Sequence, residues 1–120
     1  MKNKYFYNAK ILKVVDGDTV DISVDLGFSI LSFQRMRLYG IDTKELRSKN
    51  PEFKVLALEA KQYLIDKILN KDVFIETFKK DKYGRYLVII FYFDKEGNEI
   101  NINEELISKN LAEAYYGGKK

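Results

Sequence analysis

The sequence predicts a small, mainly β domain of the α+β class: a closed five-stranded barrel with one helix between the third and fourth strands and another near the carboxyl end. The length of 120 residues suits one domain with a single core. Apolar residues make up 46% of the chain and aromatic residues 14%, so enough apolar area is available to fill such a core. Short strand-like segments separated by turn residues dominate the chain, and only two stretches have a helical pattern.

The first two strands are expected at residues 9–15 and 20–26. The first reads Ala-Lys-Ile-Leu-Lys-Val-Val, and the second alternates apolar and polar residues, which is the pattern of a half-buried strand. Between them, Asp16-Gly17-Asp18-Thr19 contains an Asp-Gly pair flanked by hydrophobic residues, a strong hairpin signal. The turn therefore places Asp18 at the start of the second strand.

The third strand is expected at residues 28–41, after a bend at Gly27, and it completes an antiparallel meander. Arg35 and Arg37 are two positions apart in this strand, so both should project from the same face. Arginines in this position are commonly solvated surface charges. By themselves they do not establish a site.

A helix is expected from Pro51 to about residue 69, because Asn50-Pro51-Glu52 combines an N-cap residue, a proline at the first helical position and an early acid. Its apolar residues are spaced for one buried face: Phe53, Leu56, Ala57, Ala60, Leu64 and Ile68. The fourth and fifth strands are expected at residues 73–78 and 86–93. Asn103 is expected to cap a second helix at about residues 104–110.

Five short strands with helices in these positions are typical of a small barrel of the OB type. The sequence contains no long linker or repeat, so residues 1–120 are expected to form one domain. Its core should cover about residues 8–116, with tails at residues 1–7 and 117–120.

The composition restricts the chemistry that is available. The chain has no Cys and no His, which excludes disulfides, thiolate ligands and imidazole bases. Any metal would then be a hard, oxygen-preferring cation such as calcium. No run approaches the roughly 20 apolar residues of a membrane span, and the amino end lacks a signal-like apolar stretch. We expect a cytoplasmic protein without a membrane partner, although a form cut from a longer secreted precursor would look the same.

Three carboxylates, those of Asp18, Asp42 and Glu45, fall at or just beyond expected strand ends. Hard cations bind such oxygen clusters, and the guanidinium groups of Arg37 and Arg85 could hold a phosphodiester in two places at once. Together these groups could support phosphodiester hydrolysis without histidine. The alternative is that the acids are turn formers or solvated loop residues and that the arginines are surface charges.

Three motifs, in this order, resemble the staphylococcal nuclease (thermonuclease) family. They are Val15-Asp16-Gly17-Asp18-Thr19-Val20, then Arg37-Leu38 followed by Ile41-Asp42-Thr43 and Glu45, then Asp81-Lys82-Tyr83-Gly84-Arg85. The resemblance extends from about Ala9 to Tyr116. It implies a calcium-dependent OB-fold endonuclease that hydrolyses DNA and RNA with little sequence specificity. We expect single strands to be favoured as substrates and the protein to be a monomer.

The resemblance also implies roles for individual residues. It assigns the calcium ligands to Asp18, Asp42 and the backbone carbonyl of Thr43. It assigns the catalytic roles to Glu45 as general base and to Arg37 and Arg85 as phosphate-binding arginines. Arg37 is chosen over Arg35 because it stands five residues before Asp42, as in the family pattern. The implied substrate contacts are Lys82, Tyr83 and, as a less certain match, Tyr116, whose ring would stack on a base.

Two departures from the family pattern bear on these roles. Lys44 replaces the proline that commonly stands between the equivalents of Thr43 and Glu45, which would loosen the loop that carries Glu45. The chain also ends at residue 120 without the long carboxyl-terminal helix of secreted members, so a compact bacterial or phage type is expected.

Two other functions remain open. The first is a noncatalytic nuclease-like OB module that binds nucleic acid or a protein partner; such copies usually lose the carboxylates or arginines that this chain retains. The second is a plain single-strand-binding barrel, which needs exposed aromatic platforms. Phe28, Phe33 and Tyr92 could serve in that role, but we expect all three to lie in the core.

Overall fold

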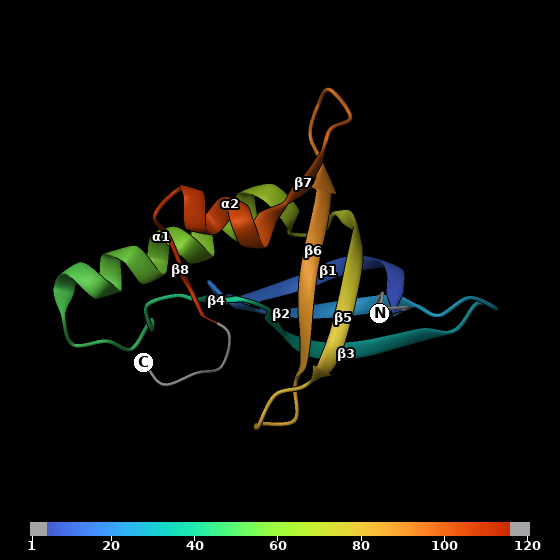
Figure 1. Cartoon of the computed structure of the whole chain (residues 1–120), viewed down its shortest axis with the longest axis horizontal. Helices are drawn as coiled ribbons and strands as arrows, with labels where there is room; N and C mark the ends of the chain where they lie inside the picture. Colours follow the sequence, from blue (N-terminus) through green and yellow to red (C-terminus); the bar gives the residue numbers. More distant parts are fainter. Residues whose placement is uncertain (1–4, 116–120) are drawn as a thin grey trace.

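The computed structural model describes residues 5–115, in which a β-barrel is flanked by two helices (Figure 1). The barrel consists of β1 Phe6–Asp16, β2 Thr19–Asp25, β3 Leu31–Leu38, β5 Asp72–Lys80 and β6 Tyr86–Phe93. The remaining elements are the short strands β4 Ile41–Asp42, β7 Glu99–Asn101 and β8 Glu113–Ala114 and the helices α1 Pro51–Ile68 and α2 Ile102–Ser108. No helix within residues 5–115 is both long enough and apolar enough to cross a membrane.

Pairing between β3 and β6 closes the barrel. The main sheet has the order β3-β2-β1-β5-β6-β7, and β3 also pairs with β6 in parallel, whereas its other pairs are antiparallel. Closure of this kind removes free edges from the five barrel strands. A separate antiparallel pair joins β4 to β8. The predicted five-stranded barrel of the OB type is therefore confirmed.

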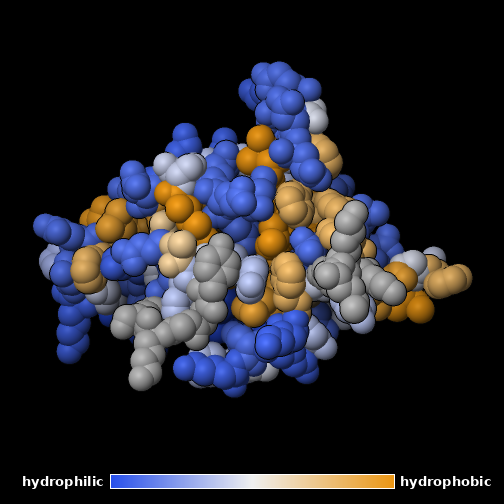
Figure 2. Space-filling view, in the orientation of Figure 1, coloured by the Kyte–Doolittle hydropathy of each residue, from blue (hydrophilic) through white to orange (hydrophobic). Residues whose placement is uncertain are grey.

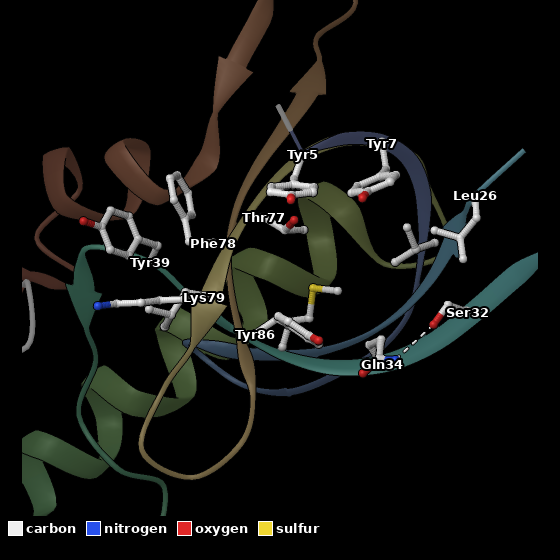
Figure 3. A pocket seen from close by; sticks show the side chains of 13 residues that line it. Tyr5, Tyr7, Leu26, Ser32, Gln34, Tyr39, Thr77, Phe78, Lys79 and Tyr86 are labelled. Atoms are coloured by element: carbon white, nitrogen blue, oxygen red, sulfur yellow. Dashed lines mark hydrogen bonds between the residues drawn. The ribbon is translucent and has the colours of Figure 1, made fainter. Parts of the chain in front are cut away.

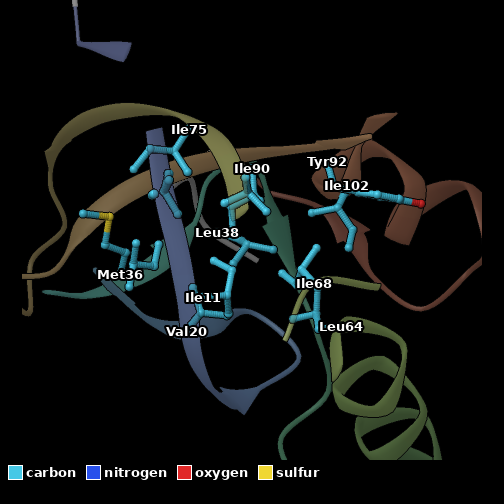
Figure 4. Close-up of a cluster of buried hydrophobic side chains, with 14 of the residues drawn as sticks. Ile11, Val20, Met36, Leu38, Leu64, Ile68, Ile75, Ile90, Tyr92 and Ile102 are labelled. Carbon is cyan, nitrogen blue, oxygen red and sulfur yellow. The ribbon is translucent and has the colours of Figure 1, made fainter. Parts of the chain in front are cut away.

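Alternating residues of the five strands fill the barrel, and α1 packs against them (Figure 4). The fully buried side chains include Ile11, Ile22, Leu38, Ile75 and Ile90. The buried residues of α1 are Ala57, Ala60, Leu64 and Ile68. Asn50 caps this helix as predicted, since its side chain accepts hydrogen bonds from the amides of Glu52 and Phe53.

The first turn of α1 departs from the prediction. Phe53 is 39% exposed rather than buried, and Leu56 is only half-buried. The helix begins well beyond the barrel, as Figure 1 shows, so its first turn has no core to pack against. The Phe53 ring instead lies 4.1 Å from the Lys44 ammonium, a cation–π contact.

The segment predicted as one long third strand is interrupted at both ends. Gly27, Phe28 and Ser29 all have positive φ angles, of 82°, 56° and 62°, and form the tip of the β2–β3 hairpin. At the other end, a turn at Gly40, with φ of 81°, separates β3 from β4. The apolar pattern continues through both turns, which is why the sequence alone did not show the breaks.

The predicted core contained two aromatic residues that the structure places on the surface. Phe28 is 95% exposed because it stands at the hairpin tip, and Phe33 is 68% exposed because it faces outward from β3. Tyr92 is buried as predicted, with 8% of its surface exposed. The expectation that all three pack inside was therefore wrong for Phe28 and Phe33.

The predicted cap of the second helix was also wrong. Asn101, not Asn103, caps α2 by accepting a hydrogen bond from the amide of Glu104. Asn103 is buried inside the molecule, where its side-chain amide donates to the carbonyls of Tyr39 and Val88 and accepts from the amide of Ile90. It thus joins α2 to β6 and to the turn that follows β3.

The expected amino-terminal tail is shorter in the structure, and the expected tail at 117–120 lies outside the described residues. Residues 6 and 7 belong to β1 and pair with β5. Near the carboxyl end, Glu113 and Ala114 form β8, which the sequence did not reveal. Tyr116, which the family resemblance implicated in substrate stacking, lies outside the described residues.

Candidate active site

Two segments that are distant in the sequence meet at one end of β3. Asp18 stands in the tight turn between β1 and β2, and its carbonyl accepts a hydrogen bond from the Leu38 amide at 2.8 Å. Arg37 is paired with Thr19 across β2 and β3, next to that turn. The turn at Gly40 then brings β4, and with it Asp42, back toward Arg37. Hairpin register and strand closure therefore place the first and second sequence motifs side by side.

The Arg37 guanidinium lies between the two aspartates. Its Nη2 atom is 3.1 Å from Oδ1 of Asp42 and 3.5 Å from Oδ2 of Asp18, and its Nη1 atom donates to the carbonyl of Ile41 at 3.1 Å. The backbone amide of Thr43 donates to the same Asp18 oxygen at 3.3 Å. The side chains of Arg37, Asp18 and Asp42 are only 15%, 13% and 23% exposed. The structure thus brings together four of the predicted site residues.

The Asp18 carboxyl is electrostatically unusual. Burial, together with a hydrogen bond and charge repulsion from Asp16, raises its pKa to about 6. The Arg37 charge and the Thr43 amide act in the opposite direction but do not cancel this rise. An ionised Asp18 is therefore short of compensating positive charge, so a cation bound beside it would be favoured.

The donor set around this point fits a hard cation. Asp18 and Asp42 offer carboxylate oxygens, which calcium prefers and which it commonly combines with backbone carbonyls and water. Within residues 5–115 no group of three or more acidic side chains is arranged to hold a metal ion. An ion held here would therefore depend on two carboxylates, the Thr43 carbonyl and water for its ligands.

Gly17 keeps this region closely packed, a role that sequence reasoning missed. A Cβ atom added to Gly17 would lie 2.7 Å from the Ala60 Cβ and 3.0 Å from the Thr43 Oγ1. Real Cβ atoms essentially never approach other atoms below 3.0 Å. Glycine is therefore needed for close approach between the β1–β2 turn, α1 and Thr43, and not only to form the turn. The Asp-Gly pattern signalled the turn but not the neighbours.

The third motif forms a loop that is organised around Asp81. The Asp81 carboxylate accepts hydrogen bonds from the amides of Tyr83 and Arg85 and pairs with the Arg85 guanidinium at 2.9 Å. Partial burial acts to raise the pKa of Asp81, but these hydrogen bonds and the Arg85 charge outweigh it, so the pKa is lowered. The Asp81 side chain thus fixes the direction of Arg85. Sequence reasoning had assigned Asp81 no role beyond the motif.

Strand pairing brings this loop to the same side of the barrel as Arg37. Arg37 is paired in parallel with Leu87, and Arg85 stands two residues before Leu87. Tyr83 is 71% exposed, with the Arg85 guanidinium 5.5 Å and the Lys82 ammonium 5.3 Å from its ring centroid. Lys82, Tyr83 and Arg85 therefore form one aromatic and cationic cluster in the loop that precedes β6.

Tyr115 is a second aromatic residue at the site. Pairing of β4 with β8 carries the chain back across the site, and the Tyr115 amide donates to the carbonyl of Gly40 at 2.9 Å. The Tyr115 ring lies 5.8 Å from the guanidinium carbon of Arg37. The sequence offered no signal for this contact, because β8 is only two residues long.

Glu45 lies on the surface of the loop that follows β4. Its carboxylate is 72% exposed and lies 3.5 Å from the Nε atom of Arg47, itself 88% exposed. Its predicted role as general base therefore stays a prediction.

A separate hollow lies at the open mouth of the barrel (Figure 3). It has a volume of about 1120 Å³, and tyrosines from β1 and β6 project into it from opposite sides. Its lining includes Tyr5, Tyr7, Gln34, Met36 and Tyr86. None of the predicted site residues lines it, whereas Asp42 and Thr43 line a small hollow of about 70 Å³ beside α1.

Comparison with known proteins points to one family. Residues 35–120 match the family model described as staphylococcal nuclease homologue. The chain is 36% identical to an uncharacterized protein of Methanocaldococcus jannaschii, with 91% of this chain and 59% of that protein covered. It is 31% identical to the thermonuclease of Staphylococcus hyicus, covering 89% and 59%. It is 30% identical to an uncharacterized endonuclease of Haemophilus influenzae, covering 88% and 51%. The chain thus spans between about half and three fifths of the length of these relatives.

Proposed function

Because the chain belongs to the family of staphylococcal nuclease homologues, we propose that it is a calcium-dependent nuclease. It hydrolyses phosphodiester bonds of DNA and RNA with little sequence specificity, favours single strands and acts as a monomer. The observation that supports this most directly is the convergence of Asp18 and Asp42 on Arg37 from two separate segments. Two partly buried carboxylates beside an arginine can bind a cation and a phosphate next to each other.

Asp18, Asp42 and the backbone carbonyl of Thr43 hold the calcium ion in this proposal. When bound, the ion polarises a phosphoryl oxygen and stabilises the negative charge that develops in the transition state. The raised pKa of Asp18 supports this role, because a carboxylate buried near Asp16 gains from a nearby cation. Low exposure of both carboxylates keeps their electrostatic interactions strong.

Arg37 and Arg85 bind the phosphate and stabilise its equatorial oxygens. Each guanidinium is fixed before substrate arrives, Arg37 by backbone carbonyls and aspartates and Arg85 by Asp81. Donors that are positioned in advance stabilise charge without reorganisation during the reaction. Tyr83 and Lys82 lie beside Arg85 and contact the nucleotide that follows.

Glu45 takes a proton from the attacking water in this proposal. For this it must turn from Arg47 toward the phosphate. The Glu45–Arg47 pair is highly exposed, and exposed ion pairs contribute only about 0 to 1 kcal/mol. The pair therefore holds Glu45 only weakly, and the reorientation costs little.

The placement of Glu45 favours one alternative. If this carboxylate never reaches the phosphate, the domain would be a noncatalytic nuclease-like module that binds nucleic acid or a protein partner. Both the nuclease and the binding module would use the arginines to bind nucleic acid, but only the nuclease would hydrolyse it. They are therefore separated by measuring binding and cleavage on the same protein.

The test is cleavage of labelled single-stranded DNA and RNA with calcium, with magnesium and with a chelator. We expect hydrolysis with calcium and none with chelator. Arg37→Ala and Arg85→Ala should each lower the rate by at least about 10²-fold, since loss of one preorganised donor typically costs 10²- to 10³-fold. Lys95→Ala, which removes an exposed cation from the β6–β7 turn, serves as the matched control. Equal cleavage with and without chelator would reject the metal role, and binding without cleavage would favour the noncatalytic module.

A further inference from the structure

The outer face of β3 continues from the candidate active site to the far end of the molecule. Side chains alternate along this strand, so Met36 and Leu38 point into the core while Arg37, Arg35 and Phe33 point outward. At roughly 3.3 Å per residue, Phe33 stands about 13 Å from Arg37 along the strand. Any chain-like ligand held by Arg37 can therefore reach Phe33.

This face carries aromatic side chains that the fold does not use. Phe33 is 68% exposed and Phe28 is 95% exposed, and Leu31 lies between them at 54%. Figure 2 shows hydrophobic residues gathered at the end of the molecule to which the β2–β3 hairpin projects. Phe28 also has a φ of 56°, a left-handed conformation that is unfavourable for a bulky residue. The fold gains no burial from Phe28 in return, which points to contact with a ligand.

Cations accompany these aromatic residues. Register places Lys10 opposite Ser23 and Lys13 opposite Asp21, on the strand next to β2, and both lysines are exposed. Arg35 projects between Phe33 and Arg37. The acids on the same face are Asp16, whose charge acts on Arg35, Asp72, which is paired with Lys10, Asp25 at the hairpin end, and Asp21, which forms an ion pair of 2.8 Å with Arg35. Basic and acidic side chains are therefore interspersed along this face, and Lys10 and Lys13 are the exposed lysines that phosphates could reach.

We propose that single-stranded nucleic acid held at Arg37 and Arg85 continues along the outer face of β3, with its bases stacked on Phe33 and Phe28. This inference rests on the proposed function, because it extends the substrate path of the same site. The ligand is argued from three observations: continuity of the face with Arg37, exposed aromatic rings, and exposed lysines that could pair with phosphates. OB-type barrels commonly use the face of their second and third strands to bind oligonucleotides.

This path along the outer face of β3, from Arg37 to Phe33 and Phe28, is called the track below. It explains a preference for single strands. Bases in a duplex are stacked on one another, whereas a single strand can present each base to an aromatic ring. Stacking tolerates any sequence because every base has a π-face, which suits an enzyme of little sequence specificity. Substrates that extend past the phosphate site should therefore bind more tightly than short ones.

The experiment measures fluorescence anisotropy of labelled oligothymidylates with chelator present, so that cleavage does not interfere. One probe is a trinucleotide, and the other has about 12 nucleotides, within the roughly 4 to 16 that OB folds occupy. Phe33→Ala should weaken binding of the long probe by about 5- to 100-fold, the range expected for one stacked base, and Phe28→Ala should do the same. The ratio of long-probe to short-probe affinity should fall in both variants. Phe33→Tyr, which retains a ring, should restore the ratio.

The control is Phe93→Ala, which removes an aromatic residue that is 58% exposed at the end of β6, away from this face. Unchanged long-probe affinity in Phe33→Ala and Phe28→Ala would overturn the track, as would an equal loss for both probes. So would a loss of self-association or of lipid-vesicle binding in these variants without any change in oligonucleotide affinity.

Cleavage in calcium, measured on the same proteins, separates the two proposals. Long-probe binding that depends on Phe33 without hydrolysis would retain the track and reject the nuclease, and hydrolysis with unchanged long-probe binding would do the reverse.

Discussion

Replacing Gly17 with alanine tests whether close packing behind Asp18 sets the geometry of the site. The new methyl would lie 2.7 Å from the Ala60 Cβ and 3.0 to 3.1 Å from two Thr43 side-chain atoms. Carbon atoms prefer separations of about 3.5 to 4.0 Å, so the turn must move by roughly 1 Å. Ala60 and Thr43 are buried, at 0% and 7% exposure, and cannot easily give way.

This displacement should affect both stability and activity. Overpacking a filled core costs about 1 to 3 kcal/mol, which for a domain of this size lowers Tm by roughly 4 to 15 °C. Asp18 follows Gly17 directly, so the displacement should also disturb its 3.3 Å hydrogen bond from the Thr43 amide. Misplacement by about 1 Å can cost on the order of 10²-fold in rate.

The assay combines urea unfolding with chelator, calcium titration by calorimetry and single-strand cleavage. Gly97→Ala is the matched control, because Gly97 has a φ of +84° but no atom within 4 Å of the added Cβ. That variant should lose stability through backbone strain alone and retain calcium affinity and cleavage.

A compensating substitution identifies the clash. Ala60→Gly removes the 2.7 Å contact, so it should offset part of the damage in Gly17→Ala. A double-mutant cycle should then give a coupling free energy of at least about 1 kcal/mol, even though glycine weakens α1 by a similar amount. The packing argument would be refuted if Gly17→Ala had the stability and calcium affinity of the unmodified protein, or if the two substitutions were additive.

Two further predictions concern buried polar groups. Asp18 has a folded-state pKa of about 6 against an ordinary value of 3.8, so between these values the metal-free folded protein binds more protons than the unfolded chain. Its free energy of unfolding should therefore fall as pH rises from about 4 to 6, by up to about 3 kcal/mol, and urea unfolding with chelator should show that Asp18→Asn removes this fall. A wild-type profile that rises through this window, or one that Asp18→Asn leaves unchanged, would contradict the argument. Asn103→Leu leaves the Ile90 amide and the Tyr39 and Val88 carbonyls without their partner, so urea unfolding should show a loss of about 3 to 5 kcal/mol. A loss below about 1 kcal/mol would mean that water or neighbouring groups replace those hydrogen bonds.

The sequence by itself determined most of the secondary structure and much of the site. The Asp16-Gly17 turn, the alternation in β2 and the Asn50-Pro51 helix start are signals contained within a few residues, and all three appear in the structure. The order of the three motifs predicted that Asp18, Asp42 and Arg37 lie together, and their side chains do so in the structure. Signals of this kind predict local structure correctly because the interactions behind them join residues that are close together in the chain.

The tertiary structure decided what those elements face. Asn101 and Asn103 are both suitable caps by residue type, but only one lies where the carbonyls of β6 and the turn after β3 need a donor. Phe28 and Phe33 belong to an apolar pattern, yet hairpin geometry and strand alternation turn them to the surface. Gly17 is required because α1 crosses closely behind it, and Arg37 meets both aspartates because β3 pairs with β2 while β4 folds back after Gly40. Burial and close approach depend on barrel closure, which joins residues far apart in the chain, and no short stretch of sequence contains that information.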